Sequence, residues 1–72
     1  MDLKIEKNLS KINRITSIKK QLQDHFGNGY DICNLELLQE EDNKLQIKFK
    51  PVYYTAPTSE WISYRFAEVE LF

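Results

Sequence analysis

The hydrophobic period of the chain changes abruptly at Gly27-Asn28-Gly29. No glycine or proline interrupts the sequence from Asp2 to Phe26, and apolar side chains recur there at intervals of three, four and seven residues. That spacing places them on one face of a helix. After Gly29, apolar and polar residues alternate, which is the pattern of a half-buried strand. The sequence therefore predicts one long helix followed by a sheet. The apolar helix positions are Ile5, Ile12, Ile15, Leu22 and Phe26, with Leu9 and Ile18 beside them.

The sequence predicts one clear end for the helix but two alternative starts. Glycine directly after the last apolar position is the usual way in which a helix stops, so the helix ends near Phe26. At the other end, Asp2 has the side chain of an N-cap, and Ser10 is a later alternative start. Leu3 and Ile5 alternate with charged residues, so this segment also fits a short strand.

The apolar helix face can also be written as a heptad series from Ile5 to Phe26, with Asn8 and Lys19 at seam positions. Polar seam residues can set register in a coiled coil. The alternative is a helix that packs on its own sheet, with the Lys19 ammonium reaching solvent beyond its apolar stem. Because the series has two polar interruptions, the sequence favours packing on the sheet.

Three segments after Gly29 have strand composition. The first includes Cys33, Leu35 and Leu37, and the second includes Leu45, Ile47 and Phe49. The last runs over residues 61–72, and residues 41–44 and 56–59 carry turn-forming side chains.

Pro51 lacks the N–H that a strand needs, so the second segment ends, bends or lies on an edge there. Adjacent antiparallel strands joined by short turns are the expected connection. The predicted fold class is α+β: one long N-terminal helix packed on a three- to four-stranded antiparallel β-meander (α-β-β-β), forming a single domain over residues 1–72.

The small size of the chain makes a stable core hard to build. A domain of 72 residues buries a limited share of its surface, and small domains often add a disulfide, a metal or a partner. The chain has one cysteine, Cys33, and one histidine, His25, which allow neither an internal disulfide nor a zinc site without carboxylates. Association, including a homodimer, is the remaining route.

Composition also predicts where the protein works. The N-terminal residues contain no apolar run, and no stretch approaches the roughly 20 apolar residues that cross a bilayer. A single cysteine is compatible with a reducing compartment. We therefore expect a cytoplasmic protein with no membrane association.

One helix covers only one face of a sheet, and the sequence leaves apolar residues for both faces. Ile32, Leu38, Val52 and Tyr54 lie by parity opposite the helix-facing set, and the last strand is apolar on both sides. One interpretation is a second apolar surface that binds a partner. The other is a bulge near Phe66 that changes the phase, so that one face alone is apolar. The residues expected to contact a partner are Tyr54, Trp61, Ile62, Tyr64, Phe66 and Phe72.

Charge is distributed unevenly along the chain. Residues 1–24 carry a net charge of +3 and residues 25–72 a net charge of -4. Four basic residues in the first half follow a 3-4-3 spacing that would align them along one side of the helix. This stripe fits a phosphate backbone or an acidic partner, or it is a solvated face balanced by Glu6 and Asp24. The stripe consists of Lys4, Lys7, Lys11 and Arg14.

No motif in the chain indicates catalysis. Cys33 lies on an apolar strand face, His25 lies in the last helical turn, and Glu40, Glu41 and Asp42 form an acidic turn that we expect to be solvated. There is no glycine-rich phosphate loop. We therefore expect no cofactor, metal or small-molecule substrate. The predicted function is a small non-enzymatic protein-interaction module, such as an adaptor, inhibitor or accessory subunit. The alternative is nucleic-acid binding through the basic stripe.

Overall fold

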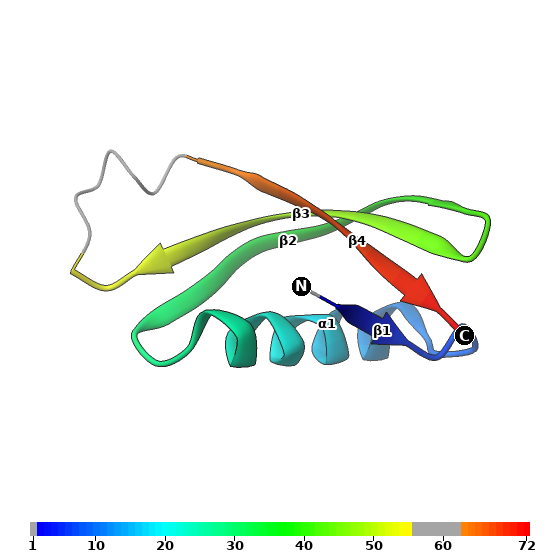
Figure 1. Cartoon of the computed structure of the whole chain (residues 1–72), viewed down its shortest axis with the longest axis horizontal. Helices are drawn as coiled ribbons and strands as arrows, with labels where there is room; N and C mark the ends of the chain where they lie inside the picture. Colours follow the sequence, from blue (N-terminus) through cyan, green and yellow to red (C-terminus); the bar gives the residue numbers. More distant parts are fainter. Residues whose placement is uncertain (1, 56–62) are drawn as a thin grey trace.

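The computed structural model describes residues 2–55 and 63–72, and they form one helix packed against one face of a four-stranded sheet (Figure 1). This arrangement confirms the predicted α+β fold class. The elements in chain order are β1 (Leu3–Ile5), α1 (Lys11–Phe26), β2 (Tyr30–Glu41), β3 (Lys44–Tyr53) and β4 (Arg65–Leu71).

The sheet has the strand order β1-β4-β3-β2. Strands β2, β3 and β4 form the predicted antiparallel meander. Strand β1 adds a parallel edge to it, with Leu3 opposite Val69 and Ile5 opposite Leu71. The first and last strands of the chain therefore lie side by side, as Figure 1 shows.

The helix starts later than Asp2. The Ser10 side chain accepts a hydrogen bond from the Asn13 N–H at 3.2 Å, so Ser10 is the N-cap and the Asp2 prediction is wrong. The reason is that Leu3 and Ile5 both bury their side chains as strand residues, which a helix would not allow at that spacing. At the other end the helix stops as predicted, because Gly27 adopts a φ of 90° and its N–H bonds the Gln23 carbonyl oxygen.

The core lies between α1 and the sheet. Ile18 and Leu22 are fully buried on the helix, and they pack against apolar side chains from all four strands. The strand residues of this core are Leu3, Ile5, Ile32, Leu45, Ile47, Phe49, Val69 and Leu71.

The phase of β2 differs from the prediction. Ile32 is buried on the helix side, whereas Cys33 pairs with Lys50 on the opposite face. A register shift follows Cys33, and Asn34 adopts a φ of 52°, so Leu35 returns to the helix side. The phase change thus lies in β2. β4 pairs with β3 in unbroken register from Arg65 to Glu70, so the alternative interpretation, a bulge near Phe66, is wrong.

The helix is rotated relative to the predicted apolar face. The Arg14 side chain points inward and is only 15% exposed. Successive helix residues are about 100° apart, so a residue two positions away lies on the opposite side. Ile12 is accordingly 76% exposed. The heptad series does not describe the packing face, which is centred on Ile18 and Leu22.

The outer edge of β1 is closed by a side chain of the helix. The Lys4 N–H donates to Gln21 Oε1 at 3.1 Å, and Gln21 Nε2 donates to the Lys4 carbonyl oxygen at 2.8 Å. One amide side chain therefore takes the place of a neighbouring strand, which is a way of protecting an exposed edge. Among the described residues, no helix has the length and apolar composition that crossing a bilayer requires.

We expect Gln21→Leu to loosen β1. The substitution keeps a similar volume but removes both hydrogen bonds to Lys4, at a cost of about 1 kcal/mol in the free energy of unfolding. Urea denaturation measures this cost, and amide hydrogen exchange should show faster exchange at Lys4. Lys20→Leu, at the neighbouring exposed position, is the control. Equal effects from the two substitutions would show that Gln21 does not hold β1.

Candidate interaction surface

The sheet face that α1 leaves uncovered carries opposite charges at its end beside β1 and the β2–β3 hairpin. Lys4 pairs with Glu70 at 3.7 Å and Lys44 pairs with Glu68 at 3.6 Å. Gln46 also donates to the Glu68 carboxylate at 2.8 Å. Exposed pairs of this kind each contribute little to stability. They make this part of the outer face polar, so it does not form the apolar surface that strand parity allowed.

Apolar surface on the outer face gathers at the start of β4. Phe66 is 69% exposed and lies opposite Lys48 in the β3–β4 register. The ring of Tyr64 lies beneath two ammonium groups, with Lys48 Nζ at 4.1 Å and Lys50 Nζ at 4.4 Å from its centroid. Cation–π contacts of this kind hold the ring and the lysines together. These four residues, Lys48, Lys50, Tyr64 and Phe66, are called the Tyr64–Phe66 patch below.

The structure separates the residues that were predicted to contact a partner. Tyr64 and Phe66 lie in the patch, and Tyr54 is exposed just after β3. Phe72 is 70% exposed but lies beside β1, where its N–H bonds the Ile5 carbonyl oxygen. Strand rise places it roughly 20 Å from Phe66. Trp61 and Ile62 lie outside the described residues. Contact of these residues with a partner stays a prediction.

The predicted basic stripe is not a helix face. Lys4 lies in β1 and Lys7 in the turn after it, whereas only Lys11 and Arg14 belong to α1. The prediction that all four align along one helix is therefore wrong, because the helix begins at Lys11.

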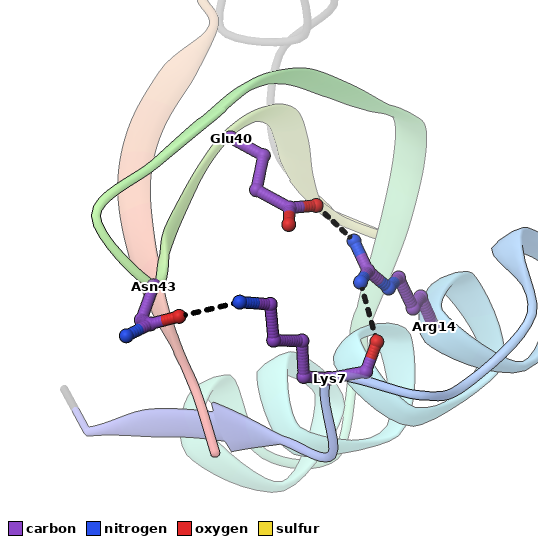
Figure 2. A network of polar contacts seen from close by, with 4 residues as sticks. All are labelled: Lys7, Arg14, Glu40 and Asn43. Atoms are coloured by element: carbon purple, nitrogen blue, oxygen red, sulfur yellow. Dashed lines mark hydrogen bonds and ion pairs between the residues drawn. The ribbon is translucent and has the colours of Figure 1, made fainter.

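Arg14 and Lys7 tie the start of the helix to the β2–β3 hairpin. Arg14 donates to Glu40 Oε1 at 2.6 Å and to the Lys7 carbonyl oxygen at 2.7 Å, while Lys7 Nζ donates to Asn43 Oδ1 at 2.8 Å. Figure 2 shows the four residues of this network. Asp42 and Asn43 both have positive φ, as a tight two-residue hairpin turn requires. The sequence suggested that Glu40 is solvated. In the structure, its carboxylate instead accepts a hydrogen bond from Arg14.

Cys33 and His25, the two residues considered for catalysis, lie in β2 and in the last turn of α1. Cys33 lies on the outer face of β2, and burial together with the nearby Asp31 carboxylate raises the pKa of its thiol. A raised pKa lowers the fraction of reactive thiolate at neutral pH. The His25 ring stacks edge-on with Phe26 at 5.2 Å. Within residues 2–55 and 63–72, no three metal-ligating side chains form a group that could hold an ion.

Sequence analysis missed the convergence of Lys48 and Lys50 on one aromatic ring. Their alternation along β3 does place both on the same face. The position of Tyr64 beside them depends on the register between β3 and β4, which the sequence does not state.

Comparison with models of known families, with curated proteins and with solved structures found no match to this chain. The function therefore has to be argued from the surfaces just described.

We expect Arg14→Met to destabilise the protein by about 1–2 kcal/mol. The substitution removes charge-assisted hydrogen bonds to Glu40 and to the Lys7 carbonyl oxygen, and the partial exposure of Glu40 limits the loss. Urea denaturation measures the change. Lys11→Met, an exposed position in the same helix, is the matched control. An Arg14 variant as stable as the Lys11 variant would contradict a structural role for the network.

Proposed function

We propose that this protein is a small non-enzymatic protein-interaction module, an adaptor, inhibitor or accessory subunit that binds a partner protein through the Tyr64–Phe66 patch. The observation that carries the proposal is the exposure of Phe66 on a regular strand of the sheet. Aromatic side chains are enriched at the centres of protein interfaces. A rigid aromatic anchor loses little conformational entropy when a partner covers it.

The surroundings of Phe66 also support an interface. Lys48 of the patch pairs with Glu36 at 3.8 Å, and Glu68 follows Phe66 on the same face. An apolar centre within a charged and solvated border is the usual anatomy of a protein interface. The border supplies specificity and steers association, whereas the covered aromatic side chains supply most of the affinity.

We expect Phe66→Ser to weaken partner binding about tenfold or more, as loss of an interface anchor does. A photo-reactive phenylalanine analogue at position 66 identifies the partner by cross-linking in an extract of the producing cells, and titration of the purified partner measures affinity. Phe72→Ser is the matched control, because Phe72 is equally exposed at the other end of β4.

Equal loss of affinity in the Phe66 and Phe72 variants would place the binding site elsewhere. No cross-linked protein at position 66, including a second copy of this chain, would overturn the proposed function.

A second candidate function is binding of single-stranded nucleic acid, which the pairing of Lys48 and Lys50 with the Tyr64 ring favours. Aromatic rings stack on bases while neighbouring lysines contact phosphates. Two phosphate contacts predict a slope of about -1.4 in log affinity against log salt concentration. Fluorescence anisotropy with a labelled single-stranded RNA measures it, with Lys11→Ala as the neutral control. No binding at low salt would exclude this function.

A further inference from the structure

The edges of the sheet are protected unequally. The outer edge of β1 is closed by Gln21. The outer edge of β2 is interrupted by two register shifts, which disturb the regular ladder that an added strand needs. β1 pairs only with residues 69–71 of β4. In the described part of the chain, no strand neighbours β4 on this side between Arg65 and Glu68.

We propose that a second copy of this chain adds its own β4 to that open stretch, antiparallel, with Phe66 opposite Phe66 of the second copy. This inference rests on the proposed function and names the partner of the Tyr64–Phe66 patch. Pairing at an open edge supplies main-chain hydrogen bonds and makes one continuous sheet from the two copies. The arrangement is two-fold symmetric, as most homodimers are.

The facing of the side chains restricts the register. Tyr64, Phe66 and Glu68 lie on the outer face, whereas Arg65 and Ala67 face the helix side. Directly opposite residues of antiparallel strands point to the same face of the sheet. A register is therefore allowed only if it pairs outer-face residues with outer-face residues and helix-side residues with helix-side residues. The register centred on Phe66 meets this condition. It places the small Ala67 side chain of one copy opposite the long Arg65 side chain of the other. The allowed register centred on Ala67 would set Phe66 against a carboxylate.

Charge complementarity favours the Phe66 register. It sets Glu68 of one copy opposite Tyr64 of the other, whose ring lies beneath the Lys48 and Lys50 ammonium groups. The symmetry repeats this contact on the other side of the axis. Each Glu68 carboxylate, which pairs with Lys44 of its own chain, thereby also comes near Lys48 and Lys50 of the other copy, while the two exposed Phe66 rings cover one another at the centre.

β1 limits the length of the new ladder. Leu3 occupies the edge at Val69, so the ladder extends from Tyr64 to Glu68 and no further. Continuing the β1 register by one residue sets Asp2 beside Glu68, and these like charges disfavour extension of β1 into the open stretch. An interface this short belongs to the small, reversible class. We expect a dimer that dissociates on dilution.

A charge substitution tests the proposed contact. In sedimentation equilibrium over a concentration series, Glu68→Lys should raise the dimer dissociation constant about tenfold or more, because it sets lysine against Lys48 and Lys50. Glu70→Lys is the matched control, since Glu70 lies on the same face of β4 beyond the new ladder. Adding Lys50→Glu to the Glu68→Lys chain should restore part of the affinity. Equal weakening by the Glu68 and Glu70 variants would overturn the register.

A disulfide test reads the geometry directly. In a chain carrying Cys33→Ser, Phe66→Cys should form a disulfide-linked dimer under mild oxidation, because opposite residues of paired strands have Cβ atoms about 5 Å apart and a small backbone shift brings them to the roughly 4 Å that a disulfide needs. Phe72→Cys in the same background should not.

The possible failures are distinguishable. A monomer at all concentrations with no Phe66→Cys disulfide overturns the homodimer, whereas Phe66-dependent cross-linking to a different protein still supports the proposed function. A disulfide formed equally by the Phe72 variant reports random collision and also overturns the homodimer.

Discussion

The structure depends on the placement of β1 and β2 at opposite edges of one sheet. α1 connects these two strands, so it has to cross beneath β4 and β3, and it thereby covers the inner face along its length (Figure 1). Ile18 and Leu22, at the middle of that crossing, are the helix residues that become fully buried. The connection therefore determines which helix positions build the core. It also explains why a single helix is enough to cover one face of four strands.

Local patterns in the sequence were sufficient for much of the fold. The change of period at Gly27 defined the end of the helix, and the alternation around Ile47 defined the central strand. The remaining features depend on residues far apart in the chain. The alternation of Leu3 and Ile5 with charged residues allowed a short strand, but nothing in that segment indicates that it pairs with β4. Likewise, nothing near Arg14 in the sequence indicates that it turns inward to Glu40, because Glu40 lies in another element.

The candidate interaction surface could be predicted only in part from the sequence. The exposed aromatic residues of the last strand were named from composition, but parity alone assigned too much apolar surface to the outer face. Cross-strand charges such as Lys44 and Glu68 make the hairpin end of that face polar, and they come from segments that the sequence could not align. Tyr54 is exposed just after β3, and the exposed apolar surface of β4 on that face is the stretch around Phe66. That stretch is also the part of β4 that β1 does not cover, and the proposed association uses both properties together.

The pairing of β1 with β4 has a consequence for synthesis of the chain. Its contacts join residues near the two ends of the described structure, whereas the β2–β3 hairpin joins neighbours in sequence. Closing a longer loop costs more conformational entropy, and contacts of long sequence separation form slowly. On a ribosome, Leu3 and Ile5 are made before β4 and have no strand to pair with until Val69 and Leu71 have been added. Leu3 and Ile5 thus remain without their strand partner until β4 has been made, so this part of the core forms late in the synthesis of the domain.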